Sequence, residues 1–390
     1  MSVIPKIEAF ADELTAIRQD FHAHPELGFE ETRTSGIVAE KLRAYGVDEV
    51  HEGIGGTGVV GIIQGNGGGN RRVGLRADMD ALPIEEASGV PYASTNPGRM
   101  HACGHDGHTT MLLGAARYLA ETRDFDGTVV LIFQPAEEGL GGARRMIADG
   151  LFEKFPCDEI YGMHNDPNAE PGIVTVTPGP GMAGACFFDI TVKGTGSHAA
   201  MPHQSKDPIV IGTALVQQLQ SVVSRNTPPT KPIVLSVTTF NAGSAYNVVP
   251  GSATITGTVR YFHDDVIDMA SSRIRELCAG LAQAYGVEIE VDIRNVFDVL
   301  MNDPDLSEAY IAAASEVVGD GARLSEDQAT GSEDFADMLK VVPGAYCRVG
   351  HAGSVPLHNP AFVLDDAILP VGASVYARIV ETRLPAGGAT

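Results

Sequence analysis

Strand-like and helix-like stretches alternate in the first half of this chain. Residues 72–78 and 158–164 are rich in β-forming residues, and residues 128–133 form an unbroken apolar run typical of a buried strand. Residues 108–121 carry apolar positions at helical spacing, and a glycine-rich loop at 139–142 leads into a further helix. This alternation predicts an α/β fold with a mostly parallel sheet covered by helices.

The middle of the chain follows a different order. Strands are expected at 187–194, 233–240, 252–262 and 287–297, and helices at 207–224 and 265–286. The resulting β-α-β-β-α-β order is that of a ferredoxin-like domain. Because the first kind of patterning resumes at Asp303, we expect an α/β domain of residues 1–180 and 297–390 and an inserted domain of residues 181–296.

Composition narrows the possible functions. A chain of 390 residues is long enough for two domains. Its net charge of −23 argues against nucleic-acid and membrane partners, and no apolar stretch approaches the roughly 20 residues that span a bilayer.

Residues 1–14 are expected to form an acidic amphipathic helix, not a signal peptide. Five irregularly spaced cysteines suit a reducing compartment, so these features predict a cytoplasmic protein.

Potential metal ligands gather in five short stretches: MHACGHDGH at 100–108, QPAEEG at 134–139, GMHND at 162–166, SHAAMPH at 197–203 and LHNP at 357–360. Thiol, imidazole and carboxylate groups beside glycines are typical of a metal site, and a thiolate favours zinc. Several of these groups follow predicted strands, and parallel sheets gather functional groups at the carboxyl ends of their strands. The pattern indicates a metallohydrolase.

Each motif alone also has a simpler explanation. A Cys-x-His pair is more often structural, but Gly104 allows the chain to turn so that Cys103 and His105 converge. Adjacent acids usually lie in a solvated turn, but Glu137 and Glu138 follow a buried strand and a proline. A metal hydrolase needs one carboxylate on the metal and another to take a proton from the attacking water, and this pair meets both needs.

With these motifs the chain resembles the M20 metallopeptidases, in particular the branch that contains hippurate hydrolases, N-acyl-amino-acid deacylases and auxin-conjugate hydrolases. RADMDALPI, MHACGHDGH, QPAEEG, GTGSHAAMPH and LHNP occur in the order of that family, and the similarity extends from HAHPELGFEE at His22 to the C-terminal helix. The resemblance implies a two-metal catalytic domain with an inserted ferredoxin-like lid that also forms dimers.

The resemblance also implies roles for individual residues of the catalytic domain. Glu137 matches the general acid/base, and Asp80 matches the acid that orients a metal ligand, with Asp78 as the alternative. The implied ligands of the two metal ions are Cys103, His105, Glu138, His164 and His358.

In the inserted domain, His198 matches the histidine that stabilises the oxyanion, and Asn247 and Arg260 match substrate-binding positions. Glu333 lies in another family-like stretch without an assignable role. The polar residue after His164 differs from the apolar residue usual there, which leaves the local pocket shape open. No role is assigned to the following histidines: His22, His24, His51, His101, His108, His263 and His351.

The implied reaction is hydrolysis of the amide bond of an N-acyl amino acid, such as an N-acetyl or N-benzoyl derivative. It would use two divalent ions per subunit, with zinc expected and manganese, cobalt or nickel as alternatives. The implied assembly is a homodimer through the inserted domain, or a tetramer. The alternatives are a di- or tripeptidase of the same clan, a thiol hydrolase with Cys103 as nucleophile, and a non-catalytic metal-binding protein, which would not need Glu137.

Overall fold

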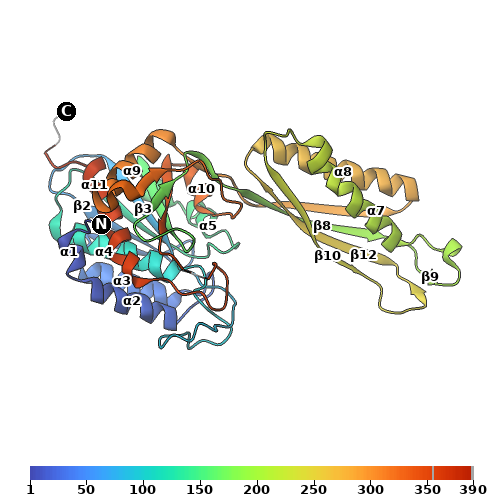
Figure 1. Cartoon of the computed structure of the whole chain (residues 1–390), viewed down its shortest axis with the longest axis horizontal. Coiled ribbons are helices and arrows are strands. Elements are labelled where there is room, and N and C mark those ends of the chain that lie inside the picture. The colour runs from blue at the N-terminus through green and yellow to red at the C-terminus, as the bar shows by residue number, and fades with distance from the viewer. Residues whose placement is uncertain (354, 388–390) are drawn as a thin grey trace. The chain divides into compact units, whose positions relative to one another are not determined.

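The computed structural model describes residues 1–353 and 355–387, and the chain divides into two compact units (Figure 1). The first unit comprises Met1–Gly181, Met301–Asp327 and Asp334–Thr390, and the second comprises Met182–Leu300 and Gln328–Glu333. Each unit has its own hydrophobic core.

An eight-stranded sheet forms the centre of the first unit. Its order is β1-β2-β4-β3-β5-β16-β6-β15, and the neighbours from β4 to β16 are all parallel. The strands are β1 (Glu49–Ile54), β2 (Gly58–Gln64), β3 (Arg72–Asp78), β4 (Thr128–Gln134), β5 (Glu159–Asp166), β6 (Val174–Val176), β15 (Ala322–Leu324) and β16 (Gly344–Gly350). The prediction of a mostly parallel sheet is confirmed.

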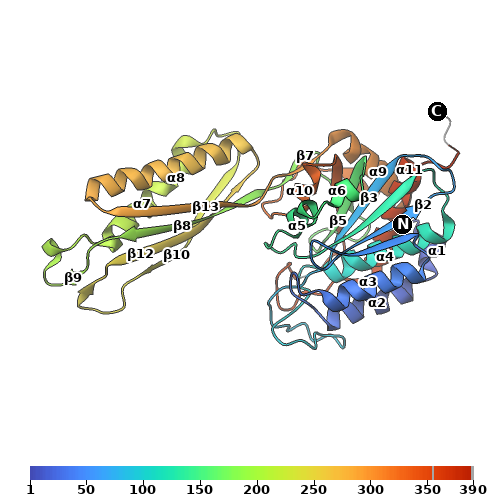
Figure 2. The same cartoon turned by 180° about the vertical axis from the view of Figure 1, so that it is seen from behind.

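Helices cover this sheet (Figures 1 and 2). The chain runs from β3 to β4 through α4 and back past β3 to β5 through α5 and α6. Because parallel crossovers are right-handed as a rule, these helices are expected on opposite faces of the sheet. The helices of the first unit are α1 (Pro5–Glu8), α2 (Ala11–Ala23), α3 (Thr32–Ala44), α4 (His105–Thr122), α5 (Gly142–Ala148), α6 (Leu151–Lys154), α9 (Pro304–Val318), α10 (Phe335–Leu339) and α11 (Leu369–Arg383). None of the described helices is both long and apolar enough to cross a bilayer.

The N-terminal segment differs from the prediction of one amphipathic helix. It forms α1 and α2, which are separated at Phe10, where the backbone has a φ of −118°. Ile7, before the break, and Phe10, at the break, are both buried in the core.

The second unit has the predicted ferredoxin-like order. Its sheet order is β10-β12-β8-β13 with every pair antiparallel, and α7 and α8 pack against it. The Asp207 side chain caps α7 by accepting a hydrogen bond from Ile209 N–H. The elements are β8 (Gly184–Lys193), α7 (Pro208–Ser221), β10 (Ile233–Ala242), β12 (Ser252–Tyr261), α8 (Asp264–Tyr285) and β13 (Glu288–Phe297). Shorter strands pair as β9 (Ser197–His198) with β11 (Val248–Val249) and β7 (Gly179–Met182) with β14 (Leu300–Asn302).

A buried ionic network attaches α2 to the N-terminus of α4. The Arg18 guanidinium is fully buried, with Nη1 3.5 Å from Asp106 Oδ2 and Nε 2.6 Å from Asp366 Oδ1. His22 lies between two carboxylates, with Nδ1 2.9 Å from Asp106 and Nε2 3.1 Å from Glu86. Burial alone would lower the pKa of His22, but these hydrogen bonds outweigh it and raise the pKa to about 9.

We therefore expect stability to depend on the charge of His22. Its pKa is raised above the unfolded value of 6.5, so its stabilisation is complete below pH 6.5 and is lost as the pH rises through about 9. Urea unfolding of wild type and His22→Gln should show a free-energy difference that shrinks over this range. His51→Gln, which removes a partly exposed histidine paired with Glu49, is the control and should show no such trend. A constant difference for His22→Gln would contradict the expectation.

Candidate metal centre and active site

The parallel strands bring the predicted residues to one edge of the sheet. Asp78 ends β3, Glu137 follows β4, and His164 lies near the end of β5. The segment that leads to His358 follows β16, which is parallel to β5. Since parallel strands share the direction of their carboxyl ends, residues far apart in the sequence meet at this edge.

Cys103 and His105 are placed by a left-handed glycine. Gly104 has a φ of 94° and caps the N-terminus of α4, and a Cβ there would lie 2.3 Å from the side chain of Asn165. Only glycine fits this turn. The Cys103 Sγ atom consequently lies 3.4 Å from Nε2 of His164.

Asp80 orients His105. The Nδ1 atom of His105 lies 2.9 Å from the Asp80 carbonyl oxygen and 3.2 Å from Asp80 Oδ1, while Oδ2 of Asp80 accepts a hydrogen bond from Glu138 N–H at 3.0 Å. Such a carboxylate–histidine pair fixes the ring orientation and leaves Nε2 available for another partner.

Glu138 connects the remaining predicted ligands. Its Oε1 lies 3.3 Å from His358 Nε2 and 4.0 Å from His105 Nε2. Ligand atoms of Cys103, Glu138 and His358 all lie within 4.8 Å of one another. His358 has a φ of 62°, a left-handed value uncommon for a residue with a side chain, and its N–H donates to Ala102 O at 2.8 Å.

Glu137 is close to the same cluster. Its side chain is buried, and a carboxylate oxygen lies within 4.8 Å of ligand atoms of His105 and Glu138. The structure therefore brings together Glu137, Asp80 and the five predicted metal ligands, although these residues lie in five separate segments of the sequence.

The cluster fits divalent metal ions. His105 Nε2 and Glu138 Oε1 are buried, and within residues 1–353 and 355–387 neither makes a hydrogen bond of good geometry, since Glu138 Oε1 has only the contacts to His358 and His105 given above. Buried polar atoms normally find a partner, so these two atoms indicate one that the chain itself does not provide. One thiol, three imidazoles and a carboxylate are suitable ligands for zinc and related ions.

A second acid–histidine pair lies beside the cluster and was missed by sequence reasoning. Asp78 Oδ1 lies 2.7 Å from His108 Nδ1, and His108 Nε2 accepts a hydrogen bond from Asn165 N–H at 3.0 Å. Burial alone would raise the pKa of Asp78, but His105, His108 and Arg76 hold it well below its usual range. The signal available in the sequence was the i, i+3 spacing of His105 and His108 on one helix, together with the second acid of the RADMD motif.

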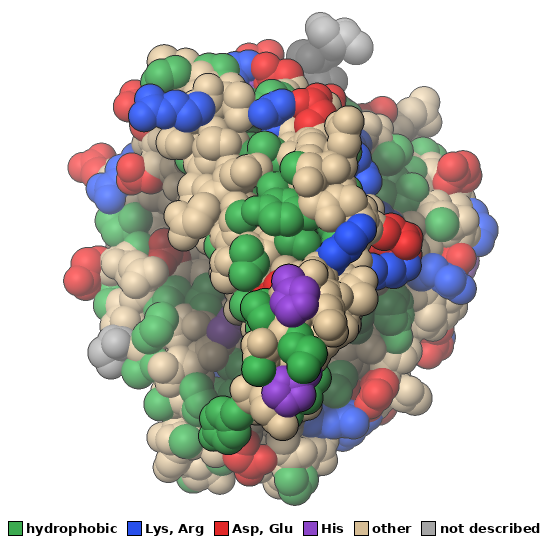
Figure 3. Space-filling view, turned by 90° about the vertical axis from the view of Figure 1, so that its right-hand side faces the viewer, with side chains coloured by type: hydrophobic (Ala, Val, Ile, Leu, Met, Phe, Trp, Pro, Cys, Tyr) green, Lys and Arg blue, Asp and Glu red, His purple; other side chains and the backbone are tan. Residues whose placement is uncertain are grey.

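The other predicted residues lie in the second unit. His198 is exposed in β9, and the adjacent Ala199 N–H donates to Asn247 O at 3.0 Å. Figure 3 shows histidine side chains exposed beside hydrophobic ones on this view of the surface. Arg260 is partly buried on β12, with its guanidinium 5.8 Å from the centre of the Phe187 ring.

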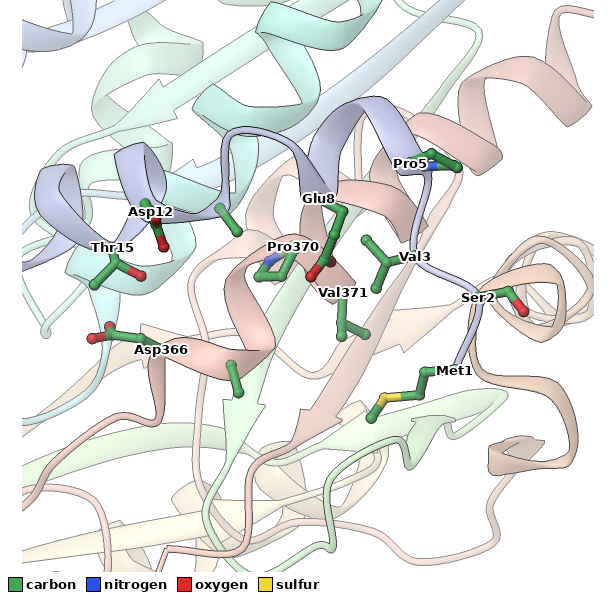
Figure 4. Close-up of a pocket in the computed structure, with 12 residues that line it drawn as sticks. Met1, Ser2, Val3, Pro5, Glu8, Asp12, Thr15, Asp366, Pro370 and Val371 are labelled. Atoms are coloured by element: carbon green, nitrogen blue, oxygen red, sulfur yellow. The ribbon is translucent and has the colours of Figure 1, made fainter.

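Glu333 is buried, and its role stays unassigned. Figure 4 shows a separate hollow of about 660 Å³ in the first unit, lined by the N-terminal segment, α2 and the start of α11. Its Asp366 is paired with Arg18, and no predicted site residue lines it.

The fold and this donor set define a metal-dependent hydrolase, and comparison with known proteins identifies the family. The chain matches Peptidase family M20/M25/M40 over residues 74–382. It is 42% identical to hippurate hydrolase of Campylobacter jejuni over 380 residues, which cover 97% of this chain and 98% of the relative. It is 37% identical to N-acetylcysteine deacetylase of Bacillus subtilis, with 95% and 97% covered.

The crystal structure of a dinuclear metal-binding M20 peptidase from Bacillus subtilis superimposes with a TM-score of 0.83 at 33% identity, covering 97% of this chain and 99% of that one. This chain belongs to the M20/M25/M40 peptidase family. The predictions of an M20 hydrolase that acts on amide bonds and of a dinuclear metal-binding family are confirmed.

Separate substitutions of Glu137 and Glu138 test whether these adjacent acids have different roles. Glu137→Gln keeps the shape of the side chain but cannot accept a proton, so we expect kcat to fall about 100-fold or more with metal content unchanged. Glu138→Gln should instead lower the metal content, measured by elemental analysis. Normal turnover in Glu137→Gln, with an inactive but fully metal-loaded Glu138→Gln, would show that the two roles are reversed.

Proposed function

We propose that this protein hydrolyses the amide bond of N-acyl amino acids and releases a carboxylic acid and a free amino acid. The observation that carries this proposal is the cluster of Cys103, His105 and Glu138 beside Glu137, in which two buried ligand atoms, His105 Nε2 and Glu138 Oε1, make no hydrogen bond of good geometry. Relatives named for the hydrolysis of hippurate and of N-acetylcysteine, each matched over nearly its full length, support the substrate class.

In the proposed mechanism, each residue of the cluster has a separate task. Cys103, His105, Glu138, His164 and His358 would hold two divalent ions. When bound, such ions lower the pKa of water and polarise the amide carbonyl. Glu137 takes the proton from the attacking water and returns it to the leaving nitrogen. Asp80 keeps His105 oriented throughout, and His198 donates a hydrogen bond to the developing oxyanion.

The thiol-hydrolase alternative has one observation in its favour, the 3.4 Å separation of Cys103 Sγ and His164 Nε2. However, burial and the nearby Glu138 raise the pKa of Cys103, whereas an activated thiol nucleophile needs a lowered one. We therefore assign Cys103 to the metal. The thiolate favours zinc. Manganese, cobalt and nickel are the alternatives, and elemental analysis distinguishes them from zinc.

We further propose that the second unit acts as a lid and dimerisation domain. His198 pairs with Val248 at one end of the unit, whereas Arg260 pairs with Ala185, near the point where the chain enters it. The nine residues of extended strand from Ser252 to Arg260 span about 26 Å, at about 3.3 Å for each of the eight steps between them. One small substrate cannot bridge this distance, so His198 and Arg260 of one chain would serve different active sites of a two-fold dimer.

The proposed location is the cytoplasm. All five cysteines lie in the described part of the chain and are free thiols, which is the usual state in a reducing compartment.

A substrate panel tests the proposed reaction. We expect hydrolysis of N-acetyl, N-benzoyl or indole-acetyl amino acids to exceed hydrolysis of di- and tripeptides by at least about 10-fold in kcat/KM. The reason is that peptides carry a free α-amine, whereas a site for the proposed substrates has no such group to bind. Exhaustive chelation should abolish the activity and added divalent metal should restore it. Faster hydrolysis of peptides would establish the peptidase alternative, and full activity in metal-free protein would establish the thiol alternative.

Subunit complementation tests the proposed dimer. Inactive His198→Ala and inactive Glu137→Gln subunits are mixed under conditions of subunit exchange. If His198 acts on the partner's site, each mixed dimer has one site with both residues intact, so roughly half of the sites in mixed dimers should be active. His203→Ala, which changes another exposed histidine nearby, should stay active alone and is the matched control. No recovery despite verified exchange would place His198 in its own subunit's site or outside catalysis.

A further inference from the structure

The segment 26–31, within the HAHPELGFEE motif, has no part in the proposed mechanism, yet it touches two loops of the candidate site. Leu27 forms a parallel bridge with Ala81, which follows the predicted orienting acid at the end of β3. Gly28 lies directly against Ala136 in the loop after β4, because a Cβ at Gly28 would be 3.0 Å from the Cα of Ala136. The segment therefore connects the loops that carry the two halves of the site.

Glu31 makes the most specific of these contacts. Its Oε1 accepts a hydrogen bond from Ala136 N–H at 2.8 Å, and its Oε2 accepts one from the Thr57 hydroxyl at 2.5 Å. The side chain is fully buried. Each carboxylate oxygen thus has its own donor, and one of these donors belongs to the residue directly before Glu137.

The backbone of Ala136 needs this support. Its φ of 54° is left-handed, a conformation that residues with a Cβ rarely adopt. Ala136 is also buried, so its N–H would be costly to leave without an acceptor. The turn determines the directions in which Glu137 and Glu138 leave the strand.

Maintaining an acid at position 31 is energetically unfavourable. Burial raises the pKa of Glu31 to about 7, although the hydrogen bond from Thr57 acts in the opposite direction. A buried carboxyl group is tolerated only where its hydrogen bonds repay the loss of water. Here the bonded partner is the turn that precedes the proposed base.

We propose that Glu31 is a positioning residue of the active site: by accepting the Ala136 amide hydrogen it fixes the left-handed turn that directs Glu137 to its task as the base. The proposal rests on the function proposed above for Glu137. Glu31 itself touches neither the substrate nor a metal ligand, so its effect is on the rate of the chemical step and not on affinity.

The test compares Glu31→Ala with Glu31→Gln. Glutamine can still accept from Ala136 with its carbonyl oxygen and donate to Thr57 with its amide, so Glu31→Gln should keep kcat within about threefold. Glu31→Ala should lower kcat at least about 10-fold, with KM within about twofold and metal content unchanged. Hydrogen exchange of the peptide that contains Ala136 should be faster in Glu31→Ala than in wild type or Glu31→Gln.

Glu26→Ala is the matched control. Glu26 is an acid of the same segment that accepts backbone hydrogen bonds from Arg33 and Thr34 at the start of α3, so its loss should lower the melting temperature without lowering kcat. If Glu31→Ala does not fold, Thr57→Val, which removes only the anchor of the carboxylate, should give a smaller loss of kcat with metal retained.

Three results would overturn the proposal: unchanged kcat in Glu31→Ala, unchanged kcat in Thr57→Val when Glu31→Ala does not fold, or an equal loss in Glu31→Gln and Glu31→Ala. Kinetics use the N-acyl amino acid that wild type hydrolyses fastest. If wild type hydrolyses none of them, the proposed function fails. In that case hydrogen exchange alone decides the positional claim, and equal exchange in wild type and Glu31→Ala would overturn it.

Discussion

The candidate site depends on one buried cation, the guanidinium of Arg76. It is fully excluded from solvent and donates to Gln134 Oε1 at 2.8 Å, to Asp78 Oδ2 at 2.8 Å and to Asp334 Oδ1 at 3.2 Å. A buried charge is tolerated only when it is paired and fully hydrogen-bonded. The pairing joins the last residues of β3 and β4, so the two strand ends that carry the acids of the site are fixed to each other. Asp334 extends the network to α5 through Ala143 N–H at 2.9 Å.

The histidine rings of the site are oriented by hydrogen bonds to neighbouring acceptors. In two of them one ring nitrogen is bonded to an acceptor, His105 to Asp80 and His164 to the Asn165 carbonyl oxygen at 2.6 Å, and beside the cluster both nitrogens of His108 are held, by Asp78 and by Asn165 N–H. Fixing one nitrogen selects the tautomer and directs the other nitrogen. A metal site assembled in this way needs little reorganisation when an ion binds. The free-energy cost of ordering these side chains arises during folding and not during metal binding.

The sequence predicted what periodicity and local motifs encode. Strand and helix order, the inserted β-α-β-β-α-β domain and the clustering of strand-end residues follow from patterns within short windows. The residues that hold the site in place do not follow from such local patterns. Glu31 lies 105 positions from Ala136, and Arg76 lies 258 positions from Asp334, so no local pattern joins them. The left-handed backbone of Ala136 and His358 was equally hidden, because neither is a glycine. Tertiary contacts select these conformations against local preference.

Charge gives the remaining constraint on what the site can bind. A chain with a net charge of −23 repels an anionic substrate unless it offers a local cation. Most arginines of the described residues are already committed to carboxylates, as Arg18 and Arg76 are. Arg260 differs: it is partly buried, it contacts Thr258 and the Phe187 ring, and in residues 1–353 and 355–387 no carboxylate pairs with it. A guanidinium held this way loses hydration without gaining an internal anion. Under the proposed function, the α-carboxylate of an N-acyl amino acid would supply that anion with bidentate geometry, which a neutral amide substrate could not do.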